Sequence, residues 1–125
     1  MKKLLIADDD AGIRSLVHMT LEADEFEILE AEDGERALEI ARAQQPQMVL
    51  LDVMMPGMSG FEVCAALKSD PQTAGITVVM LTAKSGEQDR TQGEAAGADD
   101  YFTKPFSPVA LLTKVDEVFS SRSGQ

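Results

Sequence analysis

The stretch LLIADDD (residues 4–10) passes directly from an apolar run to three consecutive acids. Its first four residues, Leu4 to Ala7, are typical of a short strand that is covered on both faces. Asp8, Asp9 and Asp10 follow without a break. Like charges at this spacing repel one another, so a fold that keeps them needs a helix terminus for them to cap or a positive group among them.

Short apolar runs alternate with longer amphipathic ones along the rest of the chain. Strands are predicted at 3–7, 27–31, 48–52, 77–82 and 100–103, and helices at 12–23, 35–44, 60–68, 87–96 and 108–120. This alternation predicts βαβ units and therefore a parallel sheet with helices on both faces. The fold class is α/β, a single doubly wound domain.

Capping residues mark several predicted helix starts. Ser59–Glu62 and Ser85–Gln88 have the spacing of a capping box, in which two side chains satisfy the first backbone groups of the helix. Ser107–Pro108 places a cap before a proline in the first helical position, and Asp33 is a further cap candidate. These signals support the predicted helix boundaries.

The length, the charge and the cysteine content exclude several classes of protein. With 125 residues the chain is one domain, for which we expect the bounds 1–120, with 121–125 as a flexible tail or the start of a linker. The formal charge of −11 repels phosphate backbones, so this domain is not expected to bind nucleic acid. Cys64 is the single cysteine, which excludes an internal disulfide and fits a reducing compartment.

The N-terminal apolar run is too short for a secretory signal, and no segment is long enough to span a membrane. We therefore expect a cytoplasmic domain without membrane contact.

Chemically reactive side chains follow four of the predicted strands. Asp8 and Asp9 follow the first strand, Asp52 and Thr82 end the third and fourth, and Lys104 follows the fifth. Sites in open parallel sheets form beyond the carboxyl ends of the strands, so these residues are expected to converge. Three nearby carboxylates stay ionised only beside positive charge, which Mg²⁺ and a lysine would supply. Such a set predicts a phosphoryl-handling site in which one aspartate could be the nucleophile.

Each of these residues taken alone also has an ordinary structural explanation. An acid after a strand most often caps the next helix, and for Asp10 we expect only that role. Thr82 and Tyr101 alone would be strand and core residues. His18 is expected at the surface or satisfied in the core, and Cys64 is expected to be an inert apolar residue. The functional interpretation depends on the coincidence of the four signals at strand carboxyl ends.

Four segments together resemble the signature segments of the response-regulator receiver domain of two-component signalling, in a chemotaxis-regulator-like form. They are LIADDDAGIR (5–14), MVLLDVMMPGMSGFEV (48–63), VVMLTA (78–83) and GADDYFTKPF (97–106). Their order and spacing match the family, and the resemblance covers about residues 3–120. It implies a flavodoxin-like (βα)5 fold with a five-stranded parallel sheet in the order 2-1-3-4-5.

The resemblance also implies roles for individual residues. Asp52 would be the phosphoacceptor. Asp8 and Asp9 would be the acidic pair that holds Mg²⁺, or alternatively Mn²⁺, together with Asp52 and the backbone carbonyl of Met54.

Three more residues would respond to the phosphoryl group. Lys104 would pair with it, Thr82 would be the switch hydroxyl, and Tyr101 would be the aromatic that changes rotamer. The loop positions near the phosphoryl group would be Ala83, Lys84 and Pro105, and the Lys104–Pro105 bond would be cis.

The implied function is that of a signalling module that promotes its own phosphorylation and dephosphorylation, and not that of an enzyme. A sensor histidine kinase or a histidine phosphotransfer protein would donate phosphate to Asp52. Phosphorylation would alter the surface made by the fourth helix, fifth strand and fifth helix, where an effector domain, a downstream protein or a second copy would bind. The alternative function is that of an intermediate in a multistep phosphorelay.

Three rival functions fit parts of this pattern. A haloacid-dehalogenase-type phosphatase needs a second aspartate two residues after the first, where this chain has Met54. A flavin-binding module of similar topology needs a hydroxyl- and glycine-rich loop after the first strand, where this chain has acids. A receiver that only docks partners, without phosphorylation, would not require the complete set, which is Asp8, Asp9, Asp52, Thr82 and Lys104.

Overall fold

The computed structural model of the chain describes all residues except 1, 22–25, 84–90, 92–94, 105 and 124–125. Its strands are β1 (Lys2–Ala7), β2 (Phe26–Ala31), β3 (Met48–Asp52), β4 (Thr77–Ala83) and β5 (Asp100–Lys104). Its helices are α1 (Ala11–Leu21), α2 (Gly34–Gln44), α3 (Gly60–Ser69) and α5 (Pro108–Ser123). The helix predicted at 87–96, with its Ser85–Gln88 capping box, falls largely outside the described residues.

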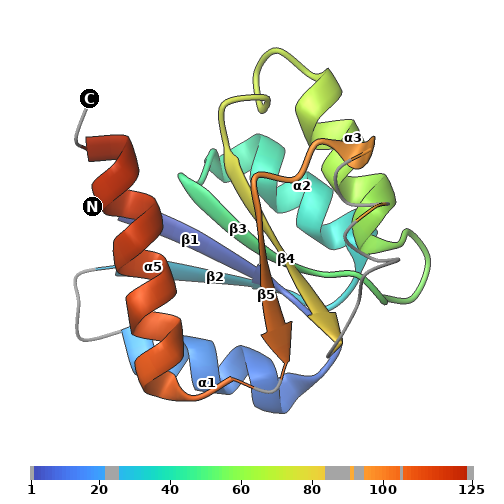
Figure 1. Cartoon of the computed structure of the whole chain (residues 1–125). Coiled ribbons are helices and arrows are strands. Elements are labelled where there is room, and N and C mark those ends of the chain that lie inside the picture. Colours follow the sequence, from blue (N-terminus) through green and yellow to red (C-terminus); the bar gives the residue numbers. More distant parts are fainter. Residues whose placement is uncertain (1, 22–25, 84–90, 92–94, 105, 124–125) are drawn as a thin grey trace.

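The five strands form one parallel sheet in the order β2-β1-β3-β4-β5, as expected. Helices α1 and α5 cover one face, and α2 and α3 cover the other (Figure 1). This is the doubly wound flavodoxin-like arrangement.

Residues of β1 show how the sequence divides into two core layers. Successive strand side chains point to opposite faces, so Leu4 and Ile6 lie in the layer beneath α1 and α5. Leu5 and Ala7 lie in the layer beneath α2 and α3. All four side chains are fully buried. Because both faces of the strand are covered, its side chains alternate between the two faces but are all apolar.

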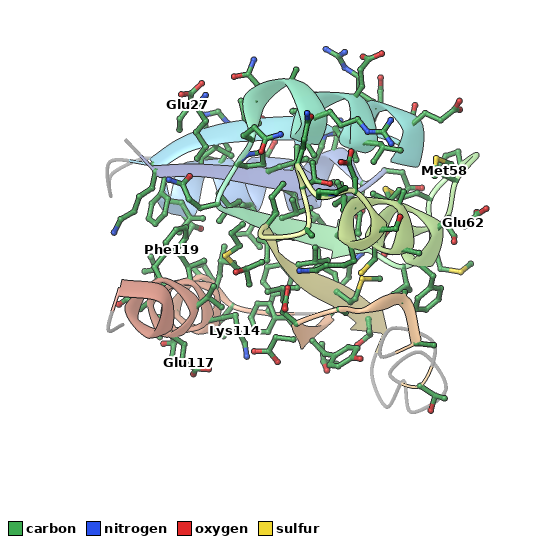
Figure 2. The ribbon with its side chains drawn as sticks, turned by 90° about the horizontal axis from the view of Figure 1, so that it is seen from above. Glu27, Met58, Glu62, Lys114, Glu117 and Phe119 are labelled. Atoms are coloured by element: carbon green, nitrogen blue, oxygen red, sulfur yellow. The ribbon has the colours of Figure 1, made fainter. Side chains whose placement is uncertain are left out.

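Figure 2 shows the inner and outer sides of α5. Phe119 faces the sheet and is buried, whereas Glu117 lies on the outer side of the helix. Lys114 joins the helix to β5, with Nζ 2.9 Å from Asp100 Oδ2, and also lies 3.6 Å from Oε1 of Glu117 in the same helix. The helix is therefore held by apolar packing on one side and by ion pairs at its edge.

The predicted caps at Ser59, Asp33 and Ser107 are confirmed. Ser59 and Glu62 form a complete capping box. Asp33 accepts a hydrogen bond from Arg36 N, and the Ser107 hydroxyl accepts one from Ala110 N.

Several predicted boundaries need small corrections. Helix α1 begins at Ala11, one residue early, because Asp10 caps it and accepts a hydrogen bond from Gly12 N. Helix α5 continues to Ser123, three residues beyond the predicted end at 120. Neither serine nor arginine stops a helix, and the first strong breaker in this region is Gly124. Strands β1 and β2 and helix α2 begin one residue early, and α3, β4 and β5 end one residue late.

Within the described part of the chain, none of the helices combines the length and the apolar character that crossing a bilayer requires.

Candidate functional site

The carboxyl ends of β1 and β3 bring two aspartates together. Ala7 pairs with Leu51 in the sheet register, which places Asp8 beside Asp52 on neighbouring strands. Both are buried: Asp8 is 0% exposed and Asp52 is 6% exposed, whereas Asp9 is exposed. One carboxylate oxygen from each of the three residues lies within 4.8 Å of the other two. The predicted convergence of these side chains is thus present.

Lys104 enters the same site from the end of β5. Its Nζ lies 2.8 Å from Asp8 Oδ2 and 3.4 Å from Asp52 Oδ1. Burial lowers the pKa of Lys104, but contact with Asp8 and the charges of Asp52 and Asp8 outweigh this effect, so its pKa is raised overall. The side chain is therefore an ammonium group at neutral pH.

One ammonium group does not balance the charge in this pocket. Burial, followed by the negative charge of Asp8, raises the pKa of Asp52 to about 6, although Lys104 acts in the opposite direction. Asp8 Oδ2 is buried and accepts no well-directed hydrogen bond from the described residues, despite its ion pair with Lys104. The pocket thus holds more acceptor oxygen than its own donors satisfy.

These features fit a hard divalent cation. Mg²⁺ and Mn²⁺ prefer carboxylate oxygens and keep several water ligands, and this cluster offers three carboxylates of which one faces solvent. Asp8, Asp9 and Asp52 are the residues that would hold such an ion. The backbone carbonyl of Met54 stays a prediction; its N–H lies 3.4 Å from Asp52 Oδ1.

The raised pKa of Asp52 has a consequence for stability in the absence of metal. The pKa of this carboxyl group is about 6 in the folded state and 3.8 in the unfolded state, so the folded state binds the proton more tightly. The resulting contribution to the free energy of unfolding is complete below about pH 3.8. That contribution is lost as the pH rises through about 6. In EDTA, we expect the free energy of unfolding of the wild type to fall by roughly 2–3 kcal/mol more than that of Asp52→Asn between about pH 4 and pH 8.

Urea titrations of both proteins across this range measure that difference. Asp10→Asn is the control, because it removes a nearby charge from an exposed cap without touching the buried pair. Parallel curves for wild type and Asp52→Asn would contradict the expected titration of Asp52.

The remaining predicted residues that the structure describes lie on β4 and β5. Thr82 is buried on β4, one position after Leu81, the partner of Asp52 in the sheet. Tyr101 is partly buried on β5 and packs against the core layer beneath α2 and α3. Ala83 pairs with Lys104 at the ends of β4 and β5. Lys84 and Pro105, and with Pro105 the predicted cis bond, lie outside the described residues.

The other candidate residues, for which the sequence predicts ordinary structural roles, have such roles. Asp10 is the cap of α1, as expected. His18 lies on the surface, where its Nδ1 is 3.0 Å from Glu30 Oε2. Cys64 is buried, and burial raises the pKa of its thiol to about 11. Of the three, Asp10 contacts the acidic pocket, through its backbone N–H, which donates a 2.9 Å hydrogen bond to Asp8 Oδ1.

Sequence reasoning missed two residues that support the pocket. Arg14 Nη1 donates a 2.8 Å hydrogen bond to the backbone carbonyl of Asp8, while its Nε lies 3.3 Å from Glu30. A basic residue near a helix N-terminus opposes the helix dipole, and this conflict is the signal that could have identified Arg14.

Gly60 is the second missed residue. A Cβ atom there would lie 2.1 Å from the carbonyl oxygen of Asp52, closer than any real contact. The first turn of α3 therefore packs directly against the backbone of Asp52. Only glycine, which has no Cβ atom, permits this close approach. A glycine directly after the Ser59 cap was visible in the sequence, but nothing local indicates its contact with Asp52.

The fold and the site together define a class: a doubly wound α/β domain with an acidic, lysine-containing pocket at the carboxyl ends of its strands. A family model for the response regulator receiver domain matches residues 4–116. The chain therefore belongs to the response regulator receiver domain family of two-component systems.

Individual relatives agree with this assignment. The chain is 44% identical over 117 residues to the phosphate regulon transcriptional regulatory protein PhoB of Pseudomonas aeruginosa, covering 94% of this chain and 51% of that protein. It is 46% identical over 114 residues to the response regulator PleD of Caulobacter vibrioides, covering 90% and 25%. The solved structure of chemotaxis response regulator CheY4 of Vibrio cholerae is similar with a TM-score of 0.89 at 35% identity, covering 94% and 98%. The chain spans about half the length of the PhoB relatives.

Proposed function

We propose that this receiver domain accepts a phosphoryl group on Asp52 from the phosphohistidine of a sensor kinase or a histidine phosphotransfer protein, in a reaction that requires Mg²⁺. The observation that carries the proposal is the buried Asp52 carboxylate held between Asp8 and the Lys104 ammonium, with Asp9 open to solvent beside it. Burying two adjacent carboxylates beside a single ammonium group is costly, which favours a functional role for this pair.

Each residue of the pocket has its own role in the proposed phosphoryl transfer. An oxygen of Asp52 attacks phosphorus, the bond from phosphorus to the histidine nitrogen breaks, and the imidazole leaves with the bonding electron pair. Lys104, already at the carboxylates, pairs with the oxygens of the incoming phosphoryl group. A bound Mg²⁺ would add positive charge that favours the ionised nucleophile and stabilises the transferred oxygens. The domain promotes its own phosphorylation and dephosphorylation in this way and is not an enzyme acting on a separate substrate.

Phosphorylation would be transmitted through Thr82 and Tyr101. The added charge and acceptor oxygens attract the buried Thr82 hydroxyl, which lies on the strand next to β3. Movement of β4 toward the site makes room for Tyr101 to change rotamer, shifting the population of two surface states. The affected surface combines β5, α5 and the predicted helix 87–96, where an effector domain, a downstream protein or a second copy binds in a cytoplasmic setting.

Labelling by acetyl phosphate tests the proposal without the unknown kinase. In Mg²⁺, we expect intact-mass measurement to show one added phosphoryl group per chain, lost on treatment with hydroxylamine, which cleaves acyl phosphates. In excess EDTA, we expect labelling to fall at least about tenfold, because the transferred charge is then poorly neutralised. Equal labelling with and without EDTA would contradict the magnesium requirement, and no labelling at all would contradict the function.

The alternative, an intermediate in a multistep phosphorelay, uses the same chemistry in both directions. It is distinguished by incubating the labelled domain with a histidine phosphotransfer protein and measuring transfer from Asp52 to histidine. Loss of the label only to water would favour a terminal receiver.

A further inference from the structure

The chain has seven methionines, and the six that the structure describes differ widely in exposure. Met48 and Met80 are fully buried, and Met55 and Met58 are partly buried against the core. Met54 and Met19 are exposed, by 76% and 73%. Oxidation of a thioether follows its accessibility, so among the described methionines these two are the most open to peroxide.

Only one of the two exposed methionines adjoins the reactive pocket. The backbone N–H of Met54 lies 3.4 Å from Asp52 Oδ1, so its side chain starts at the rim of the site. A methionine side chain is unbranched and has three rotatable bonds, which lets its sulfur sample the space before the carboxylate. Met19 lies near the C-terminus of α1, away from the carboxyl ends of the strands, where the pocket is.

We propose that Met54 is an oxidation site whose sulfoxide shortens the lifetime of the phosphoryl group on Asp52; this inference rests on the proposed function. A peroxide transfers one oxygen atom to the Met54 sulfur, which is oxidised by two electrons, while hydrogen peroxide is reduced to water. The thioether is a weak acceptor of hydrogen bonds. The sulfoxide oxygen is a strong, polar acceptor in the same place.

The sulfoxide acts on the water that removes the phosphoryl group. It accepts a hydrogen bond from this water and holds it near phosphorus, where the water oxygen forms a new bond. The bond from phosphorus to the Asp52 oxygen breaks, and a carboxylate, inorganic phosphate and a proton are released. One net hydrogen bond to the attacking water corresponds to an increase in hydrolysis rate of about two- to tenfold.

Cys64 does not compete for the peroxide. Its thiol is buried, and a pKa of about 11 leaves almost no thiolate to react at neutral pH. Partial oxidation of Met55 or Met58 is separated from that of Met54 by the variants below.

The first measurement maps oxidation on the unphosphorylated full chain. After limited treatment with hydrogen peroxide, peptide mass spectrometry should find sulfoxide at Met54 and Met19 to similar extents and far less at Met48 and Met80. This readout does not depend on phosphoryl transfer. Protection of Met54 comparable to that of Met48 would overturn the inference.

The second measurement compares phosphoryl lifetimes. Wild type, Met54→Leu and Met19→Leu are labelled with acetyl phosphate before or after oxidation, the donor is removed, and loss of phosphate is followed. Each protein is compared with its own unoxidised form, so a changed basal lifetime in Met54→Leu does not matter. We expect a two- to tenfold shorter lifetime on oxidation in wild type and Met19→Leu, none in Met54→Leu, and recovery after treatment with methionine sulfoxide reductase.

The outcomes separate the two proposals. An unchanged or longer lifetime in oxidised wild type, or equal shortening in Met54→Leu, would overturn the role of Met54 while leaving phosphorylation intact. Absence of label in the unoxidised wild type would instead refute the proposed function, and the inference with it.

Discussion

The Asp52→Asn variant is expected to take up no phosphoryl group from acetyl phosphate under conditions in which the wild type takes up one per chain. An amide at this position has no nucleophilic oxygen anion, and of its two acidic neighbours Asp9 would be held by Mg²⁺. Asp8 is fully buried, its Oδ2 lies 2.8 Å from Lys104 Nζ and its Oδ1 accepts a hydrogen bond from Asp10 N, so it is closed to an incoming phosphodonor. The expected effect is therefore loss of labelling and not a partial decrease.

Asp10→Asn is the matched control for this experiment. The same change of acid to amide occurs two residues from Asp8, at a position where asparagine caps a helix as well as aspartate does. We expect its labelling to equal that of the wild type. Intact mass before and after hydroxylamine treatment measures both variants. Stoichiometric, hydroxylamine-sensitive label on Asp52→Asn would show that the acceptor is a different residue.

The Gly60→Ala variant is expected to lose roughly 2–4 kcal/mol of stability, a large share of what a domain of this size possesses. The added methyl group would lie 2.1 Å from the Asp52 carbonyl oxygen and 2.9 Å from the Val53 Cα, both backbone atoms that cannot rotate away. Either α3 or the end of β3 must move. Because that strand end holds Asp52, binding of Mg²⁺ should weaken as well.

Gly75→Ala provides the comparison for this substitution. A Cβ atom at Gly75 meets nothing within 4 Å, so its free energy of unfolding should stay within about 1 kcal/mol of the wild type. Urea denaturation measures both variants, and Mg²⁺ titration of the folded fraction measures the pocket. A Gly60→Ala protein as stable as Gly75→Ala would mean that the close packing of α3 on Asp52 is easily relaxed.

The strands and most helix ends could be predicted because their signals are local. The run MVLLD gave the exact bounds of β3, and Ser59 with Glu62 marked the start of α3 by residues three positions apart. The end of α5 was predicted at 120, where the sequence contains no strong breaker, and the helix continues to Ser123, next to Gly124. Local preference is weakest there, and packing against the sheet decides how far a helix continues.

The members of the acidic pocket could be proposed from a rule of topology, because parallel strands bring their carboxyl ends to one edge. The rule does not say how each side chain is placed. Asp8 and Asp9 are chemically identical neighbours, yet one is fully buried beside Lys104 and the other faces solvent. Both residues lie beyond the end of β1, where Asp8 N still donates a hydrogen bond to Ala31 O of the neighbouring strand and Asp9 lies at the surface.

The amino-acid sequence alone determined the α/β class, the strand and helix order and the candidate acids, since each depends on residues close together in the chain. Only the tertiary structure decided the contact of Gly60 with Asp52, the anchoring of the Asp8 backbone by Arg14, and the pKa of about 6 for Asp52. These properties depend on distances and burial between segments far apart in sequence. Such distances are established when the two core layers close around the sheet.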